Sequence, residues 1–237
     1  MDVLSQISDA FSKSMIEFEK SESMQMLASG KLSLEHYKSI LCEVFHYTKE
    51  NPQLQALASV SFRGKDRQLV RNFLGHASSE IGHDQLALND LTTLGGKEAA
   101  ILVPRCYPLP ATTALTAYAF YCIQQRAPIG YLGYLYFLEF MPTGAGNKYS
   151  DLLLNAGVPK KAMTFLSDHI SIDVAHNKLM KKYLKALVHN PDDSAAICYS
   201  IRTTGYLYSS MLYSAITRAE SDEKFIEDPL ETGRMGD

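Results

Sequence analysis

Residues 159–189 read PKKAMTFLSDHISIDVAHNKLMKKYLKALVH, and the spacing of their apolar and charged side chains decides the fold class. On a helix that turns about 100° per residue, most lysines of this stretch fall on one side and the apolar residues on the other. This pattern predicts an amphipathic helix packed on a core. His169, Asp173 and His176 share a narrow stripe on the apolar side, so we expect all three to point inward.

The same periodicity continues through most of the chain, and no segment shows a convincing strand pattern. Glycine and proline residues separate the helical segments. We therefore predict an all-α bundle of about seven helices, at residues 3–28, 33–59, 66–94, 111–141 with a break near Pro128, 149–155, 159–189 and 193–218. Residues 1–218 are expected to form a single domain, and the polar residues 219–237 are expected to form a mobile tail.

Composition excludes several classes of function. The chain has 237 residues, a net charge of −3 and no basic stripe, so a nucleic-acid partner is not expected. The longest apolar run, 131–141, is too short to span a membrane, and the N-terminus lacks the pattern of a signal peptide. Four scattered cysteines suggest reduced thiols. These features predict a cytoplasmic protein without a membrane partner.

Three further predicted helices carry polar groups on their apolar faces. Glu80 and His83 are three residues apart in the 66–94 segment and are therefore neighbours on one helix face. Glu139 interrupts an aromatic run, and Glu43 lies among aliphatic residues. Burying such groups is unfavourable unless something compensates their charge, and a metal ion is the usual compensation.

Each of these residues also has a structural interpretation. Glu139 could pair with Arg126, and Glu50 shares the face of Glu43 and competes for its role. His46 is more simply explained by packing or a local hydrogen bond. His76 and Asp84 lie near Glu80 and are candidates for supporting the ligands rather than binding metal.

A carboxylate from each of four helices, with histidines on two of them, is the ligand pattern of a carboxylate-bridged di-metal site. Mixed oxygen and nitrogen ligands without cysteine favour iron or manganese. The predicted ligands are Glu43, Glu80, His83, Glu139, His169, Asp173 and His176.

The order of these residues resembles that of haem-oxygenase-like di-iron oxidases and oxygenases. The phrase SEIGHD at 79–84 and the late His-x3-Asp-x2-His motif carry the resemblance, which spans roughly residues 30–215. It implies a haem-oxygenase-like bundle that holds two Fe(II) ions and uses O2 as co-substrate. Family members often carry a second histidine seven residues after the glutamate of the third helix; this position is Ala87 here, so His83 would serve instead.

The resemblance also implies a small substrate with a carboxylate or amine. The most specific expectation is conversion of a halogenated tryptophan-like amino acid to a nitrile. The alternatives are oxidative decarboxylation or desaturation of a fatty acid, and metal binding without catalysis. Arg126 and Tyr136 are candidate substrate contacts, and we expect a homodimer.

Two other classes fit the sequence less well. A cofactor-independent hydrolase of the thiaminase type would need a catalytic cysteine, and none of the four stands in a convincing motif. Haem binding would need an axial histidine near the start of the bundle, where only His36 is available.

Overall fold

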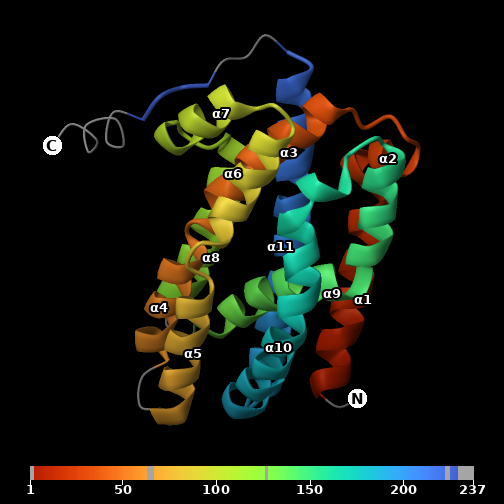
Figure 1. Ribbon diagram of the computed structural model, residues 1–237. Coiled ribbons are helices and arrows are strands. Elements are labelled where there is room, and N and C mark those ends of the chain that lie inside the picture. The colour runs from red at the N-terminus through yellow and green to blue at the C-terminus, as the bar shows by residue number, and fades with distance from the viewer. Residues whose placement is uncertain (1–2, 63–66, 126–127, 222–224, 229–237) are drawn as a thin grey trace, which may run out of the picture.

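The computed structural model describes residues 3–62, 67–125, 128–221 and 225–228, and it omits the side chains of 171–175. The described residues are almost entirely helical, with short 3-10 helices and one isolated bridge between Cys106 and Glu227 (Figure 1). The prediction of an all-α fold is therefore confirmed.

The helices divide into those before and after a proline-containing loop near residue 107. The first group comprises α1 Val3–Lys20, α2 Glu22–Ala28, α3 Leu34–Thr48, α4 Asn51–Ser61, α5 Arg67–Ser79, α6 His83–Thr93 and α7 Lys97–Leu102. The second group comprises α8 Pro110–Gln124, α9 Tyr131–Asn155, α10 Thr164–Leu187 and α11 Pro191–Ala219.

The helices are more numerous than the seven predicted, because turns divide several expected segments. The segment 66–94, for example, is broken between α5 and α6 at Gly82, whose φ of 94° favours glycine. One expected break is absent: α9 continues through Pro142 to Asn155. A proline removes one backbone donor, but packing of the flanking turns can keep the helix continuous.

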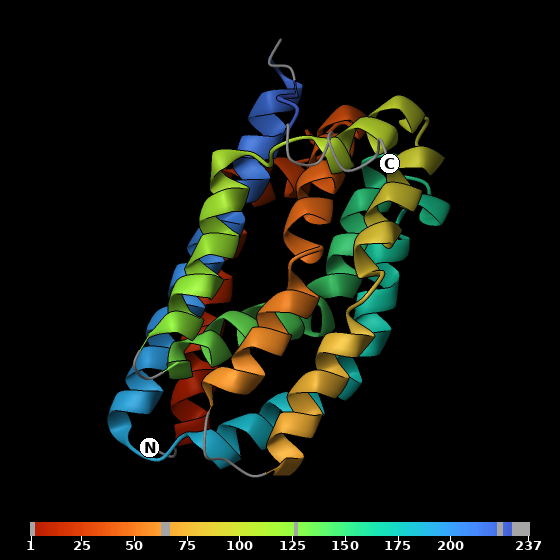
Figure 2. The ribbon, with the colours of Figure 1, turned by 90° about the vertical axis from the view of Figure 1, so that its left-hand side faces the viewer.

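α11 is the central helix, and it packs against α1, α3, α8 and α9. α10 lies along α9 and also contacts α5 and α6, so the stretch 159–189 is held between the two parts of the bundle. Figure 2 shows the bundle from another side, with α4 and α5 packed together at the front. Among the described residues no helix is both long and apolar enough to cross a bilayer.

Part of the predicted tail lies against the body of the protein. Tyr107 N donates to Ile226 O at 2.8 Å, and Asp228 N donates to Arg105 O at 2.7 Å. The guanidinium of Arg218 lies over the ring of Phe225 at 4.6 Å. Backbone hydrogen bonds thus attach residues 225–228 to the loop before α8.

Candidate metal centre

The turn between α5 and α6 places the first carboxylate of the site. Glu80 follows the last residue of α5, and His83 is the first residue of α6. The left-handed conformation of Gly82 redirects the chain between them. His83 still lies beside Glu80: its Nδ1 is 3.4 Å from Glu80 Oε2.

Glu139 lies between two imidazoles at the centre of the bundle. Its Oε1 is 3.0 Å from His76 Nε2, and its Oε2 is 3.0 Å from His176 Nδ1. The rings of His76 and His176 are 4.1 Å apart. Glu80 Oε1 lies 3.5 Å from His176 Nδ1 and 3.7 Å from His76 Nε2, so it joins the same group. All four residues are buried.

A second group shares Glu80 with the first. In the first group, His76, Glu80, Glu139 and His176 each offer one ligand atom, and these atoms lie within 4.8 Å of one another. In the second group, the ligand atoms of Glu80, His83 and His169 also lie within 4.8 Å of one another. The rings of His83 and His169 are 4.9 Å apart. One oxygen of Glu80 faces each group, so its carboxylate is shared between them.

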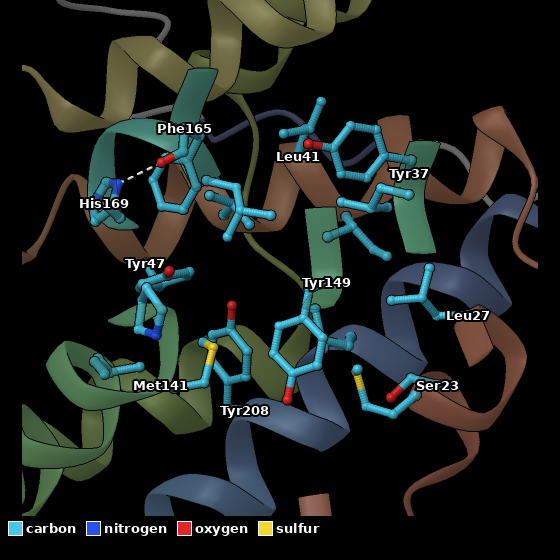
Figure 3. Close-up of a pocket in the computed structure, with 18 of the residues that line it drawn as sticks. Ser23, Leu27, Tyr37, Leu41, Tyr47, Met141, Tyr149, Phe165, His169 and Tyr208 are labelled. Atoms are coloured by element: carbon cyan, nitrogen blue, oxygen red, sulfur yellow. Dashed lines mark hydrogen bonds between the residues drawn. The ribbon is translucent and has the colours of Figure 1, made fainter. Parts of the chain in front are cut away.

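Hydrogen bonds outside the cluster orient two of the histidines. His169 Nδ1 lies 2.6 Å from Phe165 O, and a carbonyl only accepts, so Nδ1 carries the proton and Nε2 is left to bind metal (Figure 3). Ser79 donates to His76 O at 2.8 Å, and its oxygen lies 3.3 Å from His176 Nε2. This arrangement leaves His176 Nδ1 facing the carboxylates.

Asp90 positions the helix that carries His169. Its carboxylate accepts from the backbone N–H groups of Thr164 and Phe165, both at 2.9 Å, and from the Thr164 hydroxyl at 2.7 Å. These donors form the first turn of α10, where a negative charge is stabilising. Asp90 on α6 therefore fixes the start of α10 relative to the turn that holds His83.

Electrostatics keep the central carboxylate ionised. Burial alone would raise the pKa of Glu139, but the hydrogen bonds from His176 and His76 outweigh this effect and lower its pKa to about 2. Burial lowers the pKa of His169, which favours the neutral imidazole that binds metal. Burial also raises the pKa of the neighbouring Tyr131 and Tyr183, so both phenols stay protonated.

A mostly apolar cavity of about 140 Å³ opens from the metal cluster. Glu80, Glu139 and His169 line one end, and Ser23 and Leu27 of α2 line the other. Figure 3 shows His169 on one side of this cavity and Leu27 on the opposite side, with tyrosine and aliphatic side chains between them. Among the described residues that line the cavity there is no lysine or arginine.

The structure brings together five of the seven predicted ligands: Glu80, His83, Glu139, His169 and His176. The backbone of Asp173 lies in α10 between His169 and His176, but its side chain is outside the described residues. Arg126, a predicted substrate contact, is also outside them. The other predicted contact, Tyr136, stacks on Phe140 at 4.1 Å and does not line the cavity.

Glu43 is not part of the cluster. Three donors lie close to the Glu43 carboxylate: Arg218 Nη1 at 2.6 Å, the Thr112 hydroxyl at 2.5 Å and Leu109 N at 3.0 Å. Its charge is therefore compensated by an arginine and by the N-terminus of α8, without a metal ion. The alternative Glu50 is not in either ligand group.

His76 lies among the candidate ligands, whereas we had expected it only to support them. A repeated spacing in the sequence could have identified it: His76-x3-Glu80-x2-His83 matches His169-x3-Asp173-x2-His176. In the structure the two motifs pair in opposite directions, with His76 beside His176 and His83 beside His169.

The donors of this cluster suit iron. Three or more carboxylate and imidazole groups converge on each position, and they are buried or half-buried. Oxygen and nitrogen donors of this kind are the ligands that iron takes. This all-α bundle therefore carries, between its helices, a cluster of carboxylates and imidazoles that could hold metal.

Comparison with known families gives the family of the chain. The family model of iron-containing redox enzymes matches residues 38–208, so the chain belongs to this family. None of the curated proteins matches the chain.

Solved structures with this fold confirm that it is haem-oxygenase-like. A domain of unknown function with a heme oxygenase-like fold from Shewanella denitrificans is 23% identical, with a TM-score of 0.82 over 93% of this chain and 94% of that one. A TenA homolog from Pseudomonas syringae is 16% identical, with a TM-score of 0.70 over 91% and 93%. Heme oxygenase-1 from Synechocystis, in complex with heme, is 12% identical, with a TM-score of 0.67 over 93% and 95%.

Proposed function

We propose that this protein is a non-haem di-iron oxidoreductase that uses O2 to oxidise a small organic substrate. The observation that carries the proposal is the sharing of Glu80 between two groups of ligands, because a carboxylate with one oxygen toward each group can bridge two ions. Two Fe(II) ions bound there would supply the electrons that reduce O2.

The residues of the chain have separate roles in this proposal. Glu80 would bridge the two ions, Glu139, His76 and His176 would hold one, and His83 and His169 would hold the other. The hydrogen bond from His169 to Phe165 O keeps the imidazole in the tautomer that binds through Nε2. The mostly apolar wall of the cavity offers water few hydrogen-bond partners on the side from which a substrate would approach.

Haem fits this site less well than two separate ions. Haem iron takes one or two axial ligands from the protein. Here several carboxylate and imidazole groups converge, and a haem would leave most of these buried groups without a partner.

The lining of the cavity favours a substrate with an apolar chain. A free amino acid would bring an ammonium and a carboxylate, and the described lining offers no cation for the carboxylate outside the metal cluster. A fatty acid could direct its only charged group to the metal and place its chain against the apolar wall, which is formed by aliphatic and aromatic side chains. Oxidative decarboxylation or desaturation of such an acid is therefore favoured over nitrile formation from a halogenated tryptophan-like amino acid.

Anaerobic titration of the apoprotein with Fe(II), followed by mixing with O2, tests the proposal. We expect two equivalents to bind and O2 uptake to accelerate with one substrate of a panel containing saturated fatty acids of several lengths and halogenated tryptophans. Acceleration by a tryptophan alone would favour nitrile formation. Tight iron binding without O2 uptake would indicate a metal-binding protein without catalysis, and no iron binding would overturn the proposal.

A further inference from the structure

We propose that a surface hollow between α1, α2 and the second half of α9 is the entrance to the cavity, and that Met24 is its gate. The inference rests on the proposed function for its ligand, an acid with an apolar chain. α2 lies against α1, α9 and α11 (Figure 1). It lines the cavity with Ser23, Met24 and Leu27, and Figure 3 shows Ser23 and Leu27 on the side away from His169. An acid whose carboxylate reaches the metal cluster would therefore point its chain toward α2.

The hollow has a volume of about 280 Å³ and is separate from the cavity. Each of the three helices contributes to its lining, with Glu19 and Lys20 of α1, Gln25 and Ala28 of α2, and Lys148 and Leu152 of α9. The side chains of Lys20 and Lys148 are 66% and 56% exposed. The hollow therefore reaches the surface, whereas most side chains around the cavity are buried.

Two side chains form the wall between the hollow and the cavity. Met24 and Tyr149 line both spaces, and each is only 6% exposed. The ring of Tyr149 is held by an edge contact with the ring of Phe18 at 6.3 Å. The methionine side chain, in contrast, is unbranched and has three rotatable bonds, so it can change its path without a movement of the backbone. Met24 is therefore the part of this wall that can open.

The attachment of α2 also permits such an opening. α2 has seven residues, and the side chain of its N-cap residue Ser21 makes no capping hydrogen bond. Gly30, two residues after the helix, has a φ of 70°. Among the described residues, the side-chain hydrogen bond that joins α2 to another helix runs from Gln25 Nε2 to Glu19 O of α1, at 2.7 Å. A helix this short is not stable on its own, so side-chain packing holds it in place.

The charges at the rim of the hollow suit an entering carboxylate. Two lysines and one glutamate line the hollow, and Lys148 Nζ pairs with Glu19 Oε1 at 2.7 Å. Exposed ion pairs of this kind contribute little to stability, so Lys148 can exchange Glu19 for a carboxylate of the ligand at small cost. Cations at a mouth also raise the rate at which anions reach it. The described lining of the cavity has no lysine or arginine, so these cations attract the acid without retaining it before it reaches the cluster.

Uptake of a fluorescent fatty acid by the iron-free protein tests the gate. The probe has a conjugated polyene chain that brightens in apolar surroundings, and stopped-flow mixing gives its association rate. Met24→Trp fills the wall with a larger and stiffer side chain, so we expect association to slow at least about 10-fold. Met26→Trp is the matched control, because Met26 lies on the same helix and lines neither space. No uptake by the wild type, unchanged uptake by Met24→Trp, or equal slowing in both variants would overturn the proposal.

Charge reversal at the rim tests the entrance without altering the wall. Lys148→Glu should slow association of the acid several-fold at low ionic strength, and the effect should fade in high salt. The uncharged methyl ester of the same probe should enter this variant at the wild-type rate. Lys97→Glu makes the same charge change at an exposed position of α7 and should leave both rates unchanged. Wild-type uptake of the acid by Lys148→Glu, or equal slowing by Lys97→Glu, would overturn an entrance at this hollow.

Both experiments use iron-free protein, so their outcome is separate from that of the proposed function. Uptake that responds to Met24→Trp and Lys148→Glu, in a protein that binds no Fe(II), would overturn the proposed function and support the entrance. Fe(II) binding and O2 uptake accelerated by a fatty acid, with unchanged probe entry in both variants, would support the proposed function and overturn the entrance.

Discussion

Two buried carboxylates on inward helix faces, Glu43 and Glu139, look alike in the sequence and differ in what surrounds them. Glu43 is bound by Arg218 and by donors at the start of α8. Among the described side chains, the groups that pair with Glu139 are two imidazoles, His76 and His176. A guanidinium is a permanent cation, whereas a histidine can exchange its proton for a metal ion. The neighbours of a buried carboxylate thus decide whether it is structural or able to bind metal.

Glu80→Gln should have the largest effect on metal binding. It keeps the shape of the side chain but removes the charge shared by both ligand groups, so we expect loss of stoichiometric Fe(II) binding in anaerobic titration. The matched control is Glu43→Gln, which should still bind two equivalents. Retained iron in Glu80→Gln together with lost iron in Glu43→Gln would reverse the roles assigned to the two regions.

Arg218→Met should have the largest effect on stability. It leaves the Glu43 carboxylate buried without its cation, which costs about 3–5 kcal/mol of unfolding free energy. Urea unfolding of the apoprotein measures this loss. Combining Arg218→Met with Glu43→Leu should recover part of it, and Arg71→Met, at an exposed arginine of α5, should be close to wild type. Additive losses in the double variant would contradict an ion pair.

His46 provides a third case, a buried polar group with no compensation. Among the described residues neither ring nitrogen has a hydrogen-bond partner, and burial lowers the pKa of His46 to about 3. The unfolded chain takes up a proton below about pH 6.5 whereas the folded protein does not, so stability falls as the pH is lowered from 6.5 toward 3. Between pH 6.5 and 4 this loss is about 3 kcal/mol at most.

His46→Phe should remove this part of the pH dependence, as measured by urea unfolding at each pH. The control is His189→Phe, at an exposed position after α10, which should follow the wild type. An unchanged slope in His46→Phe would mean that another group accounts for the acid sensitivity.

Thr112→Val should have the smallest effect. It removes one neutral hydroxyl donor from Glu43 and leaves Arg218 in place, so we expect a loss of about 1–2 kcal/mol with unchanged iron binding. Thermal unfolding of this variant beside Thr113→Val, at the exposed next position, isolates the hydrogen bond. A loss as large as that of Arg218→Met would contradict the greater importance of the ion pair.

The sequence indicated the residues that gather in the candidate site better than it indicated the role of Glu43, which lies outside that site. Glu80, His83, Glu139, His169 and His176 could be found because helical periodicity shows which face is buried. Periodicity does not reveal what lies opposite that face. Arg218, at the other end of the chain, is what makes Glu43 structural, and no local pattern connects the two residues.

Helix boundaries were less predictable for a related reason. Gly82 and Pro142 are both helix-disrupting residues, yet the helix breaks at Gly82 and continues through Pro142. Tertiary packing of the surrounding turns decides between these outcomes, and local propensity is too weak to do so.

The opposite pairing of the two His-x3-acid-x2-His motifs has a consequence for biosynthesis. His76 and His176 lie side by side in the folded protein but leave the ribosome many seconds apart, since synthesis proceeds at about 5–20 residues per second. Until α10 has been made, Glu80 after α5 and Glu139 on α9 lack half of the imidazoles that surround them in the folded protein. The group with His83 needs His169 and the group with His76 needs His176, so a chain cut short before α10 would expose carboxylates that the folded protein buries and would complete neither group of candidate ligands.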